Sequence, residues 1–241
     1  MRLHAVKIVT SLLTVSVFGL AGCGSSSNGS GATLTPAGTV ANLSELASTY
    51  IGRPNSVSMN FPSLAGTDPQ GNALTGSLSI TPEQITVLND GASCYTTVTK
   101  VTLAQQGNTL VEETSTKYFD VSDGSFYRMV HTSSSGTTTY VRTSRDHFAG
   151  GTVKVGDSGN LGVFMGDDGT TLTATWALNP DFNGGAIFVI SQTYSNPTMG
   201  MFSEQDSFYL DATGAPTKFG FRIDAGDGTY QVSGDRSSFE H

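Results

Sequence analysis

The chain has 241 residues, of which 37% are hydrophobic, 9% aromatic and only 13% charged, against about 25% charged in an average soluble domain. Thr, Ser and Gly are abundant whereas Lys and Arg together number 12, a composition that favours β-strands joined by tight turns. The net charge of −8 argues against a nucleic-acid partner, because an acidic chain is repelled by a phosphate backbone.

The first 22 residues have the organisation of a secretion signal. Arg2, His4 and Lys7 form a basic start, and residues 8–20 are a predominantly apolar run. A bilayer-spanning helix needs about 20 apolar residues, so the shorter run is typical of a signal peptide. Its removal takes away Arg2 and Lys7 and changes the net charge from −8 to −10.

The signal ends in Leu20-Ala21-Gly22-Cys23. This tetrad resembles the lipobox of bacterial lipoproteins, in which a Leu and two small residues precede a Cys. In that family the Cys sulfur receives a diacylglycerol, the signal is cleaved before it, and the new amino terminus is usually acylated. The resemblance implies lipid attachment at Cys23 and a membrane as the partner, because several acyl chains anchor a protein firmly.

The resemblance also implies a place in the bacterial cell envelope. In the Gram-negative members of the family, Asp directly after the lipidated Cys tends to retain the protein at the inner membrane, so Gly24 favours the outer membrane. Residues 23–39 are then the lipidated cysteine and a Gly/Ser tether, which as a coil spans roughly 20–24 Å. Cys94 is left without a cysteine partner and is predicted to be a buried, inert thiol.

Residues 40–241 are predicted to form one β domain that starts with a short helix. Apolar residues recur at three- and four-residue spacing from Val40 to Ile51, which predicts one amphipathic helix. The Asn42 side chain is expected to cap the start of this helix, and the Glu45 side chain to bond back to the backbone of Asn42. Gly52 and Pro54 are expected to end the helix.

Strand patterns follow that helix. Leu172, Ala174, Trp176 and Leu178 alternate with more polar residues, as do Phe219, Phe221 and Ile223, and Gly- or Asn/Asp-containing turns separate the runs. The sequence predicts an all-β fold, an antiparallel meander of about ten to twelve strands curled into a barrel or half-barrel to hide its edges.

No catalytic constellation is found, so the sequence leans against an enzyme and predicts no cofactor. Gly156-Asp157-Ser158-Gly159 resembles the nucleophile motif of chymotrypsin-like serine proteases, but that chemistry needs a His base in a defined context. His131 and His147 lack that context, so the motif is interpreted as a turn. The Asp-Gly segments lack the ligand spacing of a calcium loop, and isolated His residues make no zinc site.

Two functions stay open for the folded domain. The first is a membrane-anchored binding or carrier module for an apolar ligand or lipid, similar in outline to periplasmic lipoprotein carriers and lipocalins. Trp176, Phe188, Phe219 and Phe221 are expected to line its inner concave face, the alternative being a packed core. The second is an envelope structural or assembly protein that contacts another protein through its β surface.

The anchoring hypothesis makes a direct prediction. Replacing Cys23→Ala removes the sulfur that would carry the lipid, so the protein should be found soluble or with its signal uncleaved. Mass spectrometry of the mature wild-type protein would contradict the hypothesis if it found Cys23 unmodified.

Overall fold

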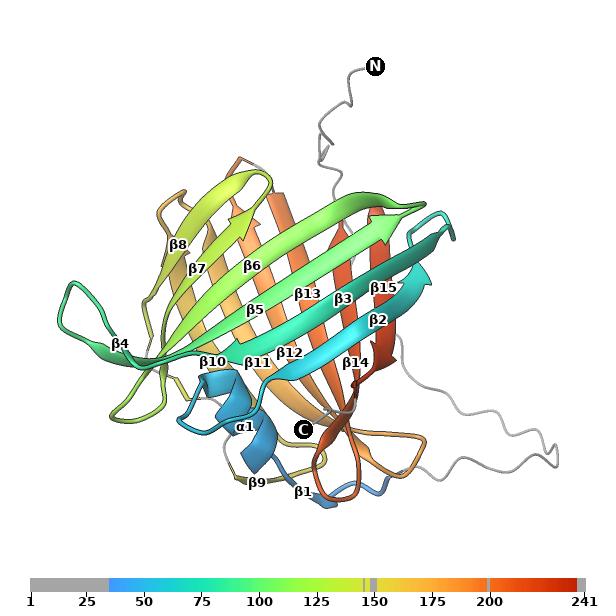
Figure 1. Cartoon of the computed structure of the whole chain (residues 1–241), viewed down its shortest axis with the longest axis horizontal. Coiled ribbons are helices and arrows are strands. Elements are labelled where there is room, and N and C mark those ends of the chain that lie inside the picture. Colours follow the sequence, from blue (N-terminus) through green and yellow to red (C-terminus); the bar gives the residue numbers. More distant parts are fainter. Residues whose placement is uncertain (1–34, 145, 148–150, 199, 238–241) are drawn as a thin grey trace, which may run out of the picture.

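The computed structural model describes residues 35–144, 146–147, 151–198 and 200–237. The signal, the lipobox with Cys23, and Gly24 lie outside the described residues. Within them, strands predominate and one short helix is present (Figure 1).

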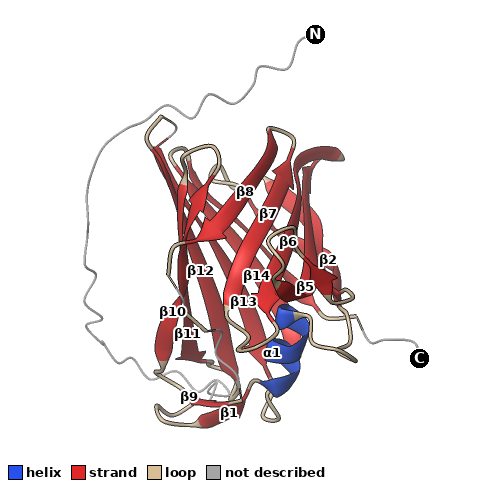
Figure 2. Cartoon of the chain, turned by 90° about the vertical axis from the view of Figure 1, so that its left-hand side faces the viewer, coloured by secondary structure: helices blue, strands red, loops and turns tan. Residues whose placement is uncertain are grey.

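Twelve antiparallel strands form a closed barrel (Figures 1 and 2). Each strand pairs with the next in the chain, and the last pairs with the first, which confirms the predicted meander and shows that it closes. The two-residue β4 (Thr86–Val87) pairs with β5 outside this circuit. The barrel strands are, in chain order, β2 (Met59–Thr67), β3 (Ala73–Pro82), β5 (Ser93–Gln105), β6 (Asn108–Asp120), β7 (Phe126–Ser133), β8 (Gly136–Arg142), β10 (Ser158–Gly166), β11 (Thr171–Pro180), β12 (Ala186–Asn196), β13 (Gly200–Leu210), β14 (Pro216–Ala225) and β15 (Gly228–Asp235).

Two of the strand pairs that close the barrel are short, and we call them seams. β8 pairs with β10 only over residues 140–142 and 164–166, and β15 pairs with β2 only over residues 231–233 and 65–67. The pairing of β12 with β13, in contrast, runs along both strands. The barrel therefore consists of two six-stranded halves, each well paired within itself. The strands of the two halves cross at a large angle in Figure 1. Few hydrogen bonds join one half to the other at the two seams.

Side chains alternate between the inside and the outside of the barrel, as the pleat of a strand requires. On β11, Leu172, Ala174 and Leu178 are buried, while the intervening Thr173 is exposed. The predicted alternation on this strand is confirmed. Seven Phe side chains, each at most 1% exposed, dominate the buried interior: Phe61, Phe119, Phe126, Phe164, Phe188, Phe208 and Phe219.

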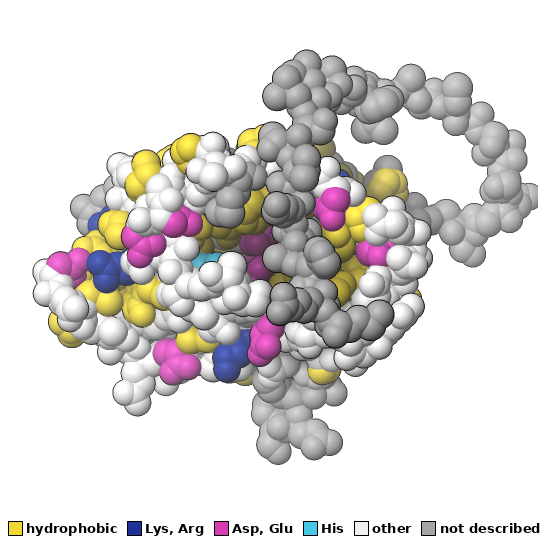
Figure 3. Space-filling view, turned by 90° about the horizontal axis from the view of Figure 1, so that it is seen from above, with side chains coloured by type: hydrophobic (Ala, Val, Ile, Leu, Met, Phe, Trp, Pro, Cys, Tyr) yellow, Lys and Arg dark blue, Asp and Glu magenta, His cyan; other side chains and the backbone are white. Residues whose placement is uncertain are grey.

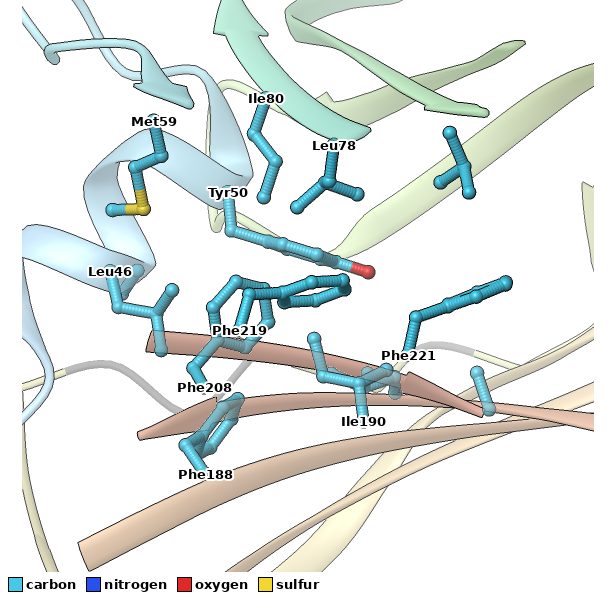
Figure 4. Close-up of a cluster of buried hydrophobic side chains, with 14 of the residues drawn as sticks. Leu46, Tyr50, Met59, Leu78, Ile80, Phe188, Ile190, Phe208, Phe219 and Phe221 are labelled. Carbon is cyan, nitrogen blue, oxygen red and sulfur yellow. The ribbon is translucent and has the colours of Figure 1, made fainter. Parts of the chain in front are cut away.

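A helix closes one end of the barrel, called here the lower end (Figure 2). α1 (Ser44–Ile51) buries Leu46, Tyr50 and Ile51, and Figure 4 shows Leu46 and Tyr50 directed toward Phe208 and Phe219 of β13 and β14. Beside α1, β1 (Val40–Asn42) pairs with β9 (Thr152–Lys154). No helix formed by the described residues is long and apolar enough to cross a membrane.

The prediction that the helix spans Val40 to Ile51 was wrong at its start. Residues 40–42 form β1, because their backbone groups pair with β9 rather than with the next helical turn. The Asn42 side chain accepts a hydrogen bond from the Ser44 N–H at 3.0 Å, but Glu45 pairs with Arg236 at 2.7 Å instead of reaching back. The helix ends at Gly52, whose φ of 80° is left-handed, as predicted.

The close approach of the strands at the β15–β2 seam predicts that replacing Gly66 by Ala destabilises the protein more than replacing Gly220 by Ala. Gly66 lies in the seam opposite Val232, and a Cβ there would overlap the Gln231 carbonyl oxygen. Gly66→Ala should therefore lower the free energy of unfolding by about 1–3 kcal/mol, as measured in urea. Gly220→Ala is the matched control, because its Cβ would lie 3.6 Å from the nearest atom, on Tyr209. Equal stability of the two variants would contradict a tight seam.

Candidate functional site

The middle of the barrel interior is charged rather than apolar. A cavity of about 20 Å³ lies there, lined by side chains from β5, β6, β12, β13 and β14. We call its polar lining residues the interior polar belt. They are Thr99, Glu113, Ser115, Lys117, Gln192, Glu204 and Asp206.

The alternation of the strands places these groups inside. On β13, Glu204 and Asp206 share the inward phase of Phe208; on β6, Glu113 and Lys117 share that of Phe119. On β13 these polar positions lie between the inward Phe202 and Phe208, and on β6 they lie between Val111 and Phe119. Burial deepens toward the end that α1 closes, from the half-buried Glu113 to Lys117, which is 2% exposed.

Lys117 links the belt to the helix that closes the barrel. Its Nζ donates a hydrogen bond to the Tyr50 hydroxyl at 2.8 Å and lies 4.2 Å from the centroid of the Tyr50 ring. Burial alone would lower the pKa of Lys117, but Tyr50, Asp206 and Glu204 outweigh it and hold that pKa above its ordinary value. The side chain is therefore a buried cation.

The three carboxyl groups of the belt hold protons more tightly than usual. Burial raises the pKa of Glu204 well above its ordinary range, helped by Glu113 and Asp206, and Glu204 also accepts a hydrogen bond from the Tyr194 hydroxyl at 3.2 Å. Burial raises the pKa of Asp206 to about 6 against the opposing effect of Lys117. Burial and Asp206 raise the pKa of Glu113 to about 7.

The belt is reached from the upper end, opposite α1. Seen from above, the barrel is hollowed, and acidic side chains and a histidine lie inside the hollow (Figure 3). His131 Nδ1 lies 3.0 Å from Ser115 Oγ, and burial, with the charge of Lys117, lowers the pKa of His131.

Stacked aromatic rings adjoin the belt. The rings of Tyr140 and Tyr194 meet edge to face at 6.0 Å, and those of Tyr194 and Phe202 stack at 4.5 Å. Since the Tyr194 hydroxyl is bonded to Glu204, this aromatic wall, Tyr140, Tyr194 and Phe202, is continuous with the charged groups. An apolar surface next to carboxylates suits an amphiphilic or cationic group.

The four aromatic residues singled out in the sequence all face the inside but are packed into the core. Phe188 and Phe219 are fully buried and Phe221 nearly so (Figure 4). Trp176 is half-buried and packs against the same cluster. Trp176 stacks on Phe188 at 5.8 Å, and Phe219 on Phe221 at 6.5 Å. Of the four, Phe221 lines the cavity of the belt. Their role as ligand contacts stays a prediction.

The structure also places the segment around Ser158, the two histidines and Cys94. The segment around Ser158 is the turn that leads into β10, where Gly159 lies under the Trp176 ring, while His131 pairs with Ser115 and His147 with Ser125. Cys94 is fully buried, and burial raises the pKa of its thiol to about 11. In the described part of the chain, no group of three or more His, Cys, Asp and Glu side chains could hold a metal ion.

The interior polar belt was not predicted from the sequence, because its residues form no local motif. The sequence does hold one indication of it. Glu204 and Asp206 occupy the same alternating positions of their strand as the apolar Phe208 and Leu210, so they are expected to point to the same side. A charged residue in the buried phase of a strand is uncommon and points to a site.

A second depression lies on the outer surface. It has a volume of about 490 Å³ and runs over β13, β14, β15 and β2. We call it the outer groove; outward side chains that line it are Gln205, Ser207, Tyr209, Arg222, Gln231 and Ser233.

Comparison with known proteins gives no relative. No family model matches the chain, and neither the curated proteins nor the solved structures include a match. The belt and the outer groove are therefore the features from which a function can be inferred.

The raised pKa values predict that the fold is more stable in mild acid than at neutral pH. A buried carboxyl group keeps a proton that the unfolded chain releases, so the free energy of unfolding falls as pH rises through the folded pKa values of about 6 and about 7. One pKa unit corresponds to about 1.36 kcal/mol, and His131 opposes the trend with its lowered pKa. We expect a net loss of about 2–4 kcal/mol between about pH 4.5 and about pH 8.

Urea unfolding at several pH values measures this loss. Glu204→Gln, which imitates the protonated acid, should flatten the dependence. Glu112→Gln is the matched control, because Glu112 is exposed on the same strand as Glu113. Stability that rises with pH over this range in the wild-type protein would contradict buried carboxyl groups.

Proposed function

We propose that the protein is a membrane-anchored binding module of the bacterial cell envelope, attached through acyl chains on Cys23, whose barrel takes up a small ligand at its upper end. The lipobox tetrad Leu20-Ala21-Gly22-Cys23 supports the anchoring, with Gly24 favouring the outer membrane. The observation that carries the binding function is the interior polar belt, a set of buried charges in a barrel that is closed at one end.

Buried charges of this kind are weak contributors to stability. Taking an ion out of water costs several kcal/mol, and the attraction between ions in the interior offsets this only where geometry is favourable. Glu113 is half-buried toward the hollow, whereas Lys117 and Glu204 are almost fully enclosed. Perturbed ionisable groups in a concave site are typical of a functional site.

The packing of the lower barrel restricts what the ligand can be. Pockets for drug-sized molecules have volumes of about 300–1,000 Å³, whereas the belt encloses about 20 Å³. The Phe-rich core below it is filled, and Tyr140 and Tyr194 are only 4% and 3% exposed. The half-buried Phe202 is therefore the part of the aromatic wall that an apolar chain can contact. We therefore propose a small or short-chain amphiphile held by its polar end.

An envelope assembly role is the second candidate, and the outer groove favours it. The groove offers Tyr209, Arg222 and two Gln side chains on a surface of the barrel that faces solvent. Such a mixture of an aromatic ring, a guanidinium and amides is typical of protein interfaces.

The two candidates differ in where a bound molecule perturbs the barrel. With the lipidated protein in nanodiscs, we expect small four-carbon amphiphiles to shift amide signals of residues 111–115 and 192–194 around the belt. Phe202→Ala removes part of the aromatic wall and should weaken this binding about tenfold. Tyr209→Ala, an outward ring on the same strand, is the control and should have no effect.

Absence of binding by any of these amphiphiles would contradict the ligand-binding function. Shifts confined to the outer groove on addition of envelope proteins, with none at the belt, would favour the assembly role instead.

A further inference from the structure

The interior polar belt carries more negative than positive groups. Three carboxyl groups, those of Glu113, Glu204 and Asp206, face one cation, Lys117. Lys117 already directs a hydrogen bond to Tyr50 on the side of the helix. Lys117 offsets the charge of Asp206 and Glu204 keeps its proton, so a second cation that enters from the upper end would balance the charge of Glu113.

Two deeply buried groups lining the cavity have polar atoms to offer. Thr99 is 7% exposed, and its Oγ1 has no hydrogen-bond partner among the described residues. Asp206 is 6% exposed, and the charge of Lys117 favours its ionised form against the effect of burial. The buried Thr99 hydroxyl without a hydrogen bond leaves hydrogen-bonding capacity unused, which is unfavourable unless a further group supplies it.

The size and the chemistry of the cavity select one kind of group. A cavity of about 20 Å³ accommodates a single water-sized group. A primary ammonium group has that size, carries one positive charge, and has three hydrogen-bond donors and no acceptor. The belt presents the complementary set, in which oxygens of Asp206, Thr99 and Glu113 or Glu204 can each accept one bond.

We propose that the interior polar belt recognises the ammonium group of a primary amine, whose carbon chain lies against Phe202, the half-buried ring of the aromatic wall. This inference rests on the proposed binding function and assigns the class of its ligand. Electron-rich ring faces also attract ammonium groups, so the wall favours a cation on its way to the carboxylates. A carboxylate or sulfate ligand would face the carboxyl groups and be repelled.

Proton release accompanies binding in this arrangement. The groups that face the amine are Glu113, Glu204 and Asp206, with Lys117, His131 and Tyr194 beside them. Glu204 keeps its proton and Asp206 is ionised at neutral pH, while Glu113, with a pKa of about 7, is divided between both forms. A cation binds the ionised form better, so the affinity should rise with pH.

Calorimetric titration of the lipidated protein in zwitterionic nanodiscs tests this, with butylamine, butanol and butyrate as matched probes. We expect butylamine to bind at least tenfold more tightly than butanol, and butyrate not to bind. Between about pH 6 and about pH 8 the affinity for butylamine, which stays protonated, should rise about five- to tenfold. Empty nanodiscs supply the background.

Three variants separate recognition from folding. Asp206→Asn keeps the shape of the side chain and should lower the butylamine affinity at least tenfold. Thr99→Val removes an unpartnered hydroxyl, so it should lower the affinity about three- to tenfold without loss of stability. Glu112→Gln, on the outward phase of β6, should bind like the wild-type protein.

The outcomes are distinguishable. Equal binding of butylamine, butanol and butyrate at the belt would overturn the amine assignment and leave the binding function standing. Folded Asp206→Asn and Thr99→Val proteins with unchanged butylamine affinity would also overturn it. No binding of any probe would contradict both the inference and the proposed function.

Discussion

The organisation of the barrel depends on the interactions of the Lys117 ammonium group. This group joins the helix that closes the lower end, through the Tyr50 hydroxyl, to the carboxyl groups in the middle of the barrel. Without this cation, Asp206 and Glu204 would face only each other and Glu113, and the buried carboxylate charge would lose the positive charge that partly offsets its cost. The interior is therefore divided into an aromatic lower core and a charged middle, with Lys117 at the boundary.

This division explains why the barrel can be closed and packed yet still hold a site. The lower core, centred on Phe208, Phe219 and the residues of α1 in Figure 4, supplies the apolar burial that stabilises the fold. Apolar side chains also lie above the belt, where Leu74, Leu103 and Leu172 are at most 1% exposed, so the charged groups form a layer in the middle of an otherwise apolar interior. Few hydrogen bonds join the halves of the barrel at the two seams. The closed barrel is therefore stabilised mainly by the longer strand pairings elsewhere and by the packed core.

Much of the fold could be predicted from the sequence, since alternation and turn chemistry are local. Thr171 to Leu178 alternates in a way that only a half-buried strand explains, and Gly52 marks a helix end by its left-handed φ. The start of the helix could not be predicted, because Val40 fits a helical stripe equally well and its pairing with β9 is a contact distant in sequence. The belt was missed for the same reason: Glu113 and Asp206 belong to strands far apart in the chain, and only closure of the barrel brings them together.

Burial of the three carboxyl groups beside Lys117 can be measured by carbon-13 NMR titration of the Glu113 side-chain carboxyl, assigned by comparison with Glu113→Gln. We expect a titration midpoint at about 7, well above the ordinary value of 4.5, and a shift of that midpoint when Asp206 is replaced by Asn. A Glu113 carboxyl that titrates at its ordinary value would show that these groups are not buried together.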